Sequence, residues 1–484
     1  MSVGRLNRFQ IAIAGASVLS LGMFSGCSAP QLPESLTTAQ WLAGDHHVHS
    51  RYSVAWNRDV DPPEPILGGH GLYPIPLNAL MAEHYGLSWM VSTDHGGRNH
   101  SKVNLEEAYP NLLMSREVVP EVIQFYGVEL NPPGADHASV IVPHSHDEAD
   151  RLFQIESQFD RADAGPGGDD PARMIEALST MRDFPDRPIV IANHPSRTAM
   201  GGARYGRTTP AELRAWNDAA PEVAIGMIGS PGHQAISIER DGSIKPAGGM
   251  GRGQYSSQPT LGGFDPMTAV IGGFWDSMLG EGRRWWITAN SDSHVHWTDG
   301  GVDFWPGEYS KTFVYAENRS FEILAALRAG RVFVTTGDLI SDLSVTVNSS
   351  SETAGLGETL SISRGSDVEV TIRVRDPDGN NAHGENPVVS RVDLIVGSTN
   401  LQSSDPDRDT NPSTYVARRF DPTNWTREGE YLTMSYRLEG VEDGIYIRVR
   451  GTNTGELEPE PDPTDEDPWT DLWFYSNPVF VVAN

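Results

Sequence analysis

The chain has little cysteine and little positive charge. Cys27 is the only cysteine among 484 residues, which excludes an intrachain disulfide. Lysine and arginine together number 36, against 65 aspartates and glutamates, and the formal net charge is −29. Because nucleic-acid phosphates are bound by clustered Lys and Arg, this balance predicts that the protein has no nucleic-acid partner. The acidity suits a soluble extracytoplasmic protein, although charge alone assigns no compartment.

The apolar stretch nearest the N-terminus, residues 9–21, is too short and wrongly flanked for a stable membrane-spanning helix. Phe24-Ser25-Gly26-Cys27 follows it and resembles the lipobox of bacterial lipoproteins, in which the cysteine is lipidated and becomes the mature N-terminus. The resemblance implies a signal peptide over 1–27, a flexible tether over 28–40 and an extracytoplasmic, membrane-anchored lipoprotein, at the outer membrane or the periplasmic face in a Gram-negative host. An ordinary secretory signal with an incidental cysteine is the alternative.

The length predicts two or three domains. From residue 41 to about residue 337, short apolar segments alternate with helix-like segments, the pattern of βα units. The expected strands are 41–49, 87–92, 122–130, 138–142, 188–192, 223–228, 285–289, 312–315 and 332–335. The expected helices are 77–85, 105–118, 171–182, 210–219, 266–279 and 320–329. Two long segments, 157–171 and 229–265, are expected to be loops, and the second is interpreted as either a lid or a surface loop.

The helical pattern ends near residue 341. β-rich segments separated by turn residues follow at 343–347, 368–374, 388–396, 415–420, 431–438, 445–450 and 473–482. About seven short strands in this space predict an all-β sandwich domain over 341–484. The acidic stretch 456–471 is interpreted as a solvated loop, with calcium binding as the alternative.

Five stretches carry metal-binding side chains at the ends of apolar runs. Side chains two positions apart on a strand point the same way, so His47 and His49 share one face. In βα barrels the functional groups gather at the carboxyl ends of the strands. Imidazole and carboxylate groups together suit zinc, iron or manganese better than calcium or magnesium. The five stretches are Asp45-His46-His47-Val48-His49, Thr93-Asp94-His95, Glu129 with His137, Asn193-His194-Pro195 and Asp292-Ser293-His294.

Most lone histidines are structural residues. His144 and His146 form a second H-x-H pair, for which a ligand role is the less favoured alternative. Structural roles are expected for His70, His84, His100, His233, His296 and His383.

Taken in order, the five stretches resemble the PHP family (polymerase and histidinol phosphatase domain). Its pattern is H-x-H, T-D-H, G-x-E with a later His, H-P and S-D-x-H, and the match covers about residues 41–337. The resemblance implies a distorted seven-stranded βα barrel with two or three divalent transition-metal ions (Zn, Mn or Fe). Glu129 would be the bridging carboxylate. By position, the implied metal ligands are His47, His49, Asp59, His95, Glu129, His137, His194, Asp292 and His294.

Asp59 is included as the nearest acidic residue after the H-x-H pair, although the gap is longer than in the family. A second, shorter resemblance lies at residues 327–337, which are similar to the end of the PHP domain in the carbaryl-hydrolase-like branch. That branch includes hydrolysis of a carbamate ester.

These features predict a metal-dependent hydrolase, most of all a phosphoesterase acting on a small-molecule ester, with Glu129, His194, Asp94 and Arg197 as catalytic residues. Asp94 and Asn193 are expected to orient imidazoles, or else to form hydrogen bonds at the strand ends. Arg98 and Arg197 are candidate clamps for a phosphate. Two alternatives stay open: a carboxyl-ester, carbamate or amide hydrolase using the same centre, and a non-catalytic surface binding lipoprotein.

Overall fold

The computed structural model describes residues 39–232, 238–244, 252–255 and 257–484. The expected signal peptide and all but the last two residues of the expected tether lie outside this set, as do His233 and parts of the 229–265 segment. Within the described residues, no helix is both long and apolar enough to cross a membrane.

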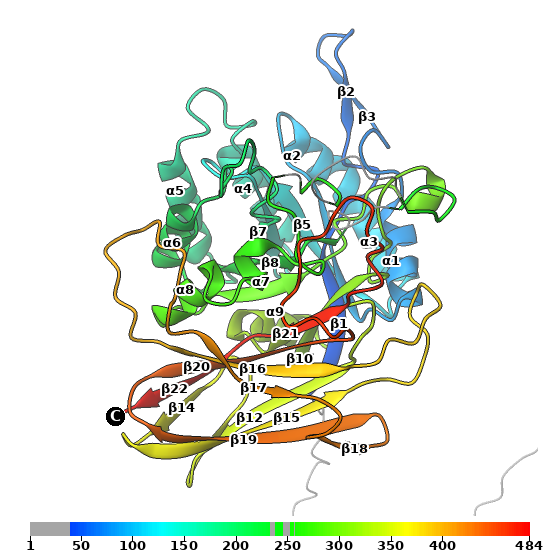
Figure 1. Ribbon diagram of the computed structural model, residues 1–484. Coiled ribbons are helices and arrows are strands. Elements are labelled where there is room, and N and C mark those ends of the chain that lie inside the picture. Colours follow the sequence, from blue (N-terminus) through cyan, green and yellow to red (C-terminus); the bar gives the residue numbers. More distant parts are fainter. Residues whose placement is uncertain (1–38, 233–237, 245–251, 256) are drawn as a thin grey trace, which may run out of the picture. The chain divides into compact units, whose positions relative to one another are not determined.

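The first two-thirds or so of the described chain alternates strands with helices, as expected (Figure 1). Its strands are β1 (Gln40–Val48), β2 (Ala55–Asn57), β3 (Glu64–Ile66), β4 (Trp89–His95), β5 (Ile123–Leu130), β6 (His137–Val142), β7 (Ile189–Asn193), β8 (Ala224–Ser230), β9 (Trp286–Ala289), β10 (Ser310–Ala316) and β11 (Val332–Thr336). Its helices are α1 (Ile75–His84), α2 (His100–Val103), the π-helix η1 (Asn104–Ala108), α3 (Tyr109–Val118), α4 (Glu148–Phe159), α5 (Pro171–Arg182), α6 (Pro210–Ala219), α7 (Pro266–Ala269), α8 (Phe274–Gly280), the 3-10 helix η3 (Trp297–Asp299) and α9 (Ser320–Ala329).

Local sequence signals explain several helix ends. Helix α6 begins with a complete capping box, in which Thr209 and Glu212 satisfy each other's backbone N–H groups. Helix α9 ends at Gly330, whose φ of 71° is open to glycine at little cost. The expected helix 266–279 is instead two short helices, α7 and α8, because Gly272 adopts a φ of 71° between them.

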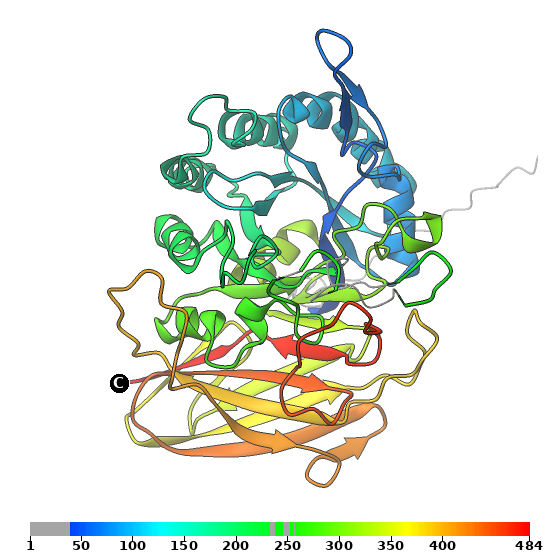
Figure 2. The ribbon, with the colours of Figure 1, turned by 45° about the horizontal axis from the view of Figure 1, so that its top comes forward.

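Apart from β2 and β3, which pair with each other, the strands up to β11 belong to a sheet that mixes parallel and antiparallel pairs. The hydrogen-bonded order along its main path is β14-β22-β20-β21-β11-β10-β1-β4-β5-β6-β7-β8-β9. Strands β1, β4 and β5 run parallel, β6 is antiparallel to both neighbours, and β7, β8 and β9 are parallel again. Within the described residues no ladder joins β9 to β1 or β10. The expected closed barrel is therefore not confirmed, and the structure shows a mixed α/β arrangement with helices outside the strands (Figure 2).

The C-terminal part is built from strands, as expected. They are β12 (Asp342–Asn348), β13 (Thr353–Ala354), β14 (Thr359–Ile362), β15 (Ser366–Arg375), β16 (Arg391–Ser398), β17 (Tyr415–Phe420), β18 (Thr426–Glu428), β19 (Tyr431–Val441), β20 (Ile445–Thr452), β21 (Trp473–Ser476) and β22 (Val479–Ala483). The expected strand 473–482 is two strands, separated at Asn477-Pro478, because proline has no N–H to donate to a ladder.

The large sheet continues across the expected domain boundary. Strand β11 pairs with β21, so strands that precede residue 341 are hydrogen-bonded to strands near the C-terminus. A second sheet has the order β13-β12-β15-β19-β18, and its Val345 and Ile372 share a hydrophobic core with Leu394 and Val449 of the large sheet. A sandwich that forms a separate domain stays a prediction.

Candidate metal centre

The first three motifs come together at one edge of the sheet because their strands are parallel. His47 lies near the end of β1, and His49 follows that strand directly. His95 is the last residue of β4, and Glu129 lies opposite it in the register of β5. The carboxyl ends of parallel strands meet at the same edge, so these side chains converge.

Two further motifs reach this edge by different routes. His137 is the first residue of β6, and because β6 is antiparallel to β5, its amino end lies at the same edge. His137 pairs in register with the last residue of β7, and His194 follows directly. Beyond β9, the backbone N–H of Asp292 donates to the carbonyl of His47 at 3.0 Å, which fixes the fifth motif beside the first.

The Glu129 carboxylate is the common neighbour of five imidazoles. Its Oε2 lies 2.9 Å from Nδ1 of His95 and 3.5 Å from Nε2 of His49. Its Oε1 lies 3.1 Å from Nε2 of His47, 2.8 Å from Nδ1 of His137 and 3.2 Å from Nε2 of His194. One oxygen faces several nitrogens from different strands, which is the arrangement expected of a carboxylate shared between ions.

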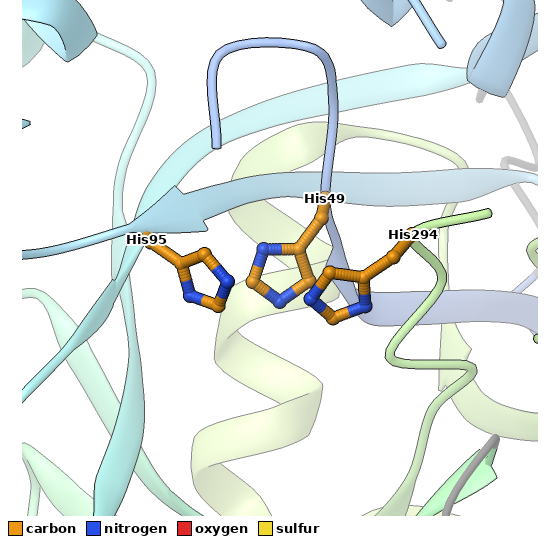
Figure 3. Close-up of side chains that lie close together, drawn as sticks. All are labelled: His49, His95 and His294. Atoms are coloured by element: carbon orange, nitrogen blue, oxygen red, sulfur yellow. The ribbon is translucent and has the colours of Figure 1, made fainter. Parts of the chain in front are cut away.

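Three overlapping groups have ligating atoms within 4.8 Å of one another. The first is His49 with His95 and His294, whose rings face one another in Figure 3. The rings of His49 and His294 are stacked, with centroids 3.8 Å apart. The second group is His47, His49, Glu129 and Asp292, and the third is Glu129, His137 and His194. His49 and Glu129 each belong to two groups, so the three groups form one continuous centre.

Outer hydrogen bonds orient the imidazoles toward the centre. Nδ1 of His47 lies 2.8 Å from the Thr93 hydroxyl. Nδ1 of His49 lies 2.9 Å from the Ser53 hydroxyl, which donates to Asp94 at 2.8 Å. With Nδ1 engaged, each ring turns its Nε2 inward. Such outer partners are typical of histidines that bind metal, so this donor set fits divalent transition-metal ions.

Asp136 and Asp303 are the outer partners of His194 and His294, respectively. Nδ1 of His194 lies 3.2 Å from the Asp136 carboxylate. Nδ1 of His294 lies 3.4 Å from Asp303, which also accepts the backbone N–H of His294. The sequence alone indicated no role for either aspartate.

Two of the candidate ligands have an uncommon backbone conformation. His194 has a φ of 28° and Asp292 a φ of 51°. Positive φ values are costly for residues with a side chain, and such residues cluster at functional sites. The surrounding hydrogen bonds hold both ligands in these conformations.

The pKa shifts favour an ionised carboxylate at the centre, and they differ in direction among the imidazoles. Burial alone would raise the pKa of Glu129, but the imidazoles of His137 and His47 outweigh it and hold the pKa well below its usual range. Burial lowers the pKa of His95 to about 4. Asp292 and Glu129 overcome the burial of His47 and raise its pKa to about 10, and Asp303 and Asp292 likewise raise the pKa of His294 to about 9. An anionic Glu129 and a neutral His95 are the forms that bind cations.

One side of the centre is open to solvent. The side chains of His95, His137 and His294 are 22%, 18% and 19% exposed, whereas those of His47 and His49 are fully buried. Arg197 lies on the same rim, where its Nη2 is 2.9 Å from Asp136 and 3.2 Å from Nδ1 of His137. A substrate that reaches the centre from this side meets a guanidinium.

Asn193 also lies in the centre. Its side-chain amide donates to Oε1 of Glu129 at 3.3 Å and lies 3.1 Å from Nε2 of His47. Its side-chain Oδ1 accepts hydrogen bonds from the backbone N–H and the hydroxyl of Ser139. Asn193 thus ties the ends of β6 and β7 together and contacts His47 at the nitrogen that faces the centre.

Other expected residues lie elsewhere. Asp59 is exposed in the loop between β2 and β3 and belongs to none of the three groups, so the structure does not bring this expected ligand to the centre. Arg98 is exposed. His144 and His146 follow the carboxyl end of β6, at the opposite edge of the sheet. The ring of His70, for which a structural role is expected, lies with its centroid 5.5 Å from that of His95.

Comparisons with known proteins give little beyond this geometry. No family model matches the chain, and neither does any curated protein. One similar solved structure is the crystal structure of Endonuclease Q in complex with a 27-mer duplex substrate with an abasic lesion at the active site. The identity is 13% and the TM-score 0.31, and the match covers 60% of this chain and 56% of that one. At this TM-score the likeness carries no argument about activity.

The same comparison corrects one prediction. A chain similar to this one is bound to a DNA duplex, which contradicts the prediction of no nucleic-acid partner. That prediction was drawn from net charge over the whole chain, and a net charge of −29 does not describe the charge at one site.

Proposed function

We propose that this protein is a metal-dependent hydrolase with a di- or trinuclear centre, and that it is a phosphoesterase. The observation that carries the proposal is the position of Glu129, whose two oxygens face five imidazoles. A purely structural metal site is normally closed by its ligands, whereas this centre has an exposed rim. The three groups would hold the ions through the nitrogen and oxygen atoms described above. When bound, such ions lower the pKa of water and polarise the oxygen of the scissile group.

The chain's own residues orient an anionic substrate. Asp136 holds the Arg197 guanidinium through Nε and Nη2, at 3.2 and 2.9 Å, with the side chain 17% exposed. A fixed guanidinium donates well to phosphoryl oxygens and stabilises negative charge that develops there. Asp94 acts indirectly, because it holds Ser53, which contacts His49.

Hydrolysis of a carboxyl ester, carbamate or amide is the second candidate. The short resemblance at 327–337 suggested it, but this segment forms the end of α9 and strand β11, whose Val332, Phe333 and Val334 are buried core residues. The segment supports the sheet and does not contribute to the metal centre. The residue that bears on the choice of substrate is Arg197 on the rim of the centre, and a guanidinium there favours the phosphoester.

The test is a panel of an aryl phosphate, an aryl phosphodiester, an aryl carbamate and a DNA duplex with an abasic site. Each is assayed with metal-loaded protein, with chelator-treated protein and with E129Q. We expect turnover of a phosphoester that is lost with chelator and in E129Q. D169N is the matched control, because Asp169 pairs with Arg207 at an exposed site. Turnover of the carbamate alone would replace the phosphoesterase assignment, and turnover of none of the four would favour a non-catalytic role.

We also propose that Cys27 carries the lipid anchor of an extracytoplasmic lipoprotein. The proposal rests on the lipobox-like Phe24-Ser25-Gly26-Cys27. Mass spectrometry of the mature N-terminus after expression in a bacterium tests it, and an unmodified Cys27 within a longer chain would contradict it.

A further inference from the structure

A second group of metal-ligating side chains lies away from the centre, in the loop before β21. It consists of Asp462, Glu466 and Asp471, and we refer to it as the loop carboxylate cluster. One oxygen from each lies within 4.8 Å of the others. Asp462 is fully buried and Asp471 is 5% exposed. Three carboxylates at this separation and depth repel one another unless a cation accompanies them.

Backbone hydrogen bonds fix Asp462 in place. Its Oδ1 accepts the N–H of Gly262 at 2.8 Å, and its Oδ2 accepts the N–H of Gly263 at 2.9 Å. Its own N–H donates to the carbonyl of Thr260 at 2.8 Å. The cluster therefore joins the loop before β21 to a segment about 200 residues earlier, and its shape is set before any ligand binds.

One guanidinium accompanies the three carboxylates. Nη2 of Arg252, which is fully buried, lies 2.5 Å from Oδ2 of Asp462 but 3.9 Å from Oδ1 of Asp471. Arg252 thus neutralises Asp462.

Two buried oxygens at the cluster have no hydrogen-bond partner among the described residues. They are Oδ1 of Asp471 and the hydroxyl of Tyr309, which is 2% exposed. A Cβ placed on Gly263 would lie 2.6 Å from that hydroxyl, so Tyr309 reaches the point where the Gly263 N–H meets Asp462. Leaving such atoms buried and unpaired costs free energy, and both oxygens are of the type that coordinates a hard cation.

We propose that the loop carboxylate cluster binds a calcium ion, with Asp471 and Glu466 as the principal ligands and Asp462 and Tyr309 completing the oxygen set. All four donors are oxygens, which separates this site from the histidine-rich centre and from the metals that centre suits. The ion would fasten the loop before β21 to residues 260–263. This calcium site is independent of the proposed hydrolase activity.

Terbium luminescence tests the site, because Tyr309, with Trp469 5.3 Å from it, can sensitise a bound Tb³⁺ ion. The full chain is first loaded with its transition metal. Tb³⁺ is then titrated and displaced with Ca²⁺ or Mg²⁺ in wild type, D471N, E466Q and D465N. Asp465 is an exposed acidic residue of the same loop and serves as the matched control.

We expect sensitised emission in wild type and D465N, displaced by Ca²⁺ at lower concentration than by Mg²⁺, and at least tenfold weaker Tb³⁺ binding in D471N and E466Q. Ca²⁺ at about 100 times its Kd should also raise the Tm of wild type by roughly 3 °C. If D471N does not fold, E466Q decides, since Glu466 is only half-buried. Equal emission in all four proteins, emission in none, or preferential displacement by Mg²⁺ would overturn the calcium assignment.

Discussion

Replacing Asp136 with Asn should weaken metal binding without removing any ligand. The buried carboxylate lies 3.2 Å from Nδ1 of His194 and 2.9 Å from Nη2 of Arg197. Asparagine keeps the size of the side chain but removes the negative charge that orients the His194 imidazole and the Arg197 guanidinium. Outer-partner substitutions at metal-binding histidines cost about 10–100-fold in metal affinity, or about 1.4–2.7 kcal/mol. We expect the loss to fall on the ion held by Glu129, His137 and His194.

Competition with a chromophoric chelator measures the apparent Kd of each ion in wild type and D136N. D169N is the control, because it removes an exposed aspartate paired with Arg207. The reasoning is refuted if D136N binds every ion within twofold of wild type. It is also refuted if D136N loses all ions together with its fold, since the carboxylate would then be a general structural element.

Three other predictions concern activity, stability and pH. Arg197→Ala should lower kcat/KM by about 10²–10³-fold on the substrate found in the panel, and Arg197→Lys should restore only part of this. Asp276→Ala should lower the free energy of unfolding by about 3–5 kcal/mol in urea melts, because it leaves the fully buried Arg448 unpaired; D367N, at an exposed pair, should change it little. Burial raises the pKa of Glu212 from 4.5 to about 7. The contribution of this carboxyl group to the stability of the fold is therefore fully present below about pH 4.5, where the group is protonated, and it is lost as the pH rises through 7. E212Q keeps the capping box, so wild type should lose stability relative to E212Q between pH 5 and pH 8; a constant difference would contradict this.

The candidate ligands could be predicted because they follow strands. His47, His95 and Glu129 come at the ends of apolar runs, and a sheet brings such ends together wherever the intervening helices go. The order of motifs therefore indicated the site without any knowledge of distances. Helix α4 (Glu148–Phe159) was missed although its buried Leu152, Ile155 and Phe159 recur at helical spacing.

The outer partners could not be predicted. Asp303 contacts His294 from an irregular segment nine positions later, where neither strand nor helix periodicity applies. Asp59 was chosen as the nearest acidic residue, but strands β2 and β3 have three residues each, too few for their alternation to be recognised, and the hairpin carries Asp59 into solvent. The continuity of the large sheet through β11 and β21 depends on residues about 140 apart, which no local pattern records.

Elemental analysis of the purified chain, with E129Q measured in parallel, tests the central claim most directly. The account predicts two or three transition-metal ions per chain in wild type, and fewer in E129Q, because Glu129 is shared by two of the three groups. No bound metal after reconstitution with zinc, manganese or iron would contradict the account.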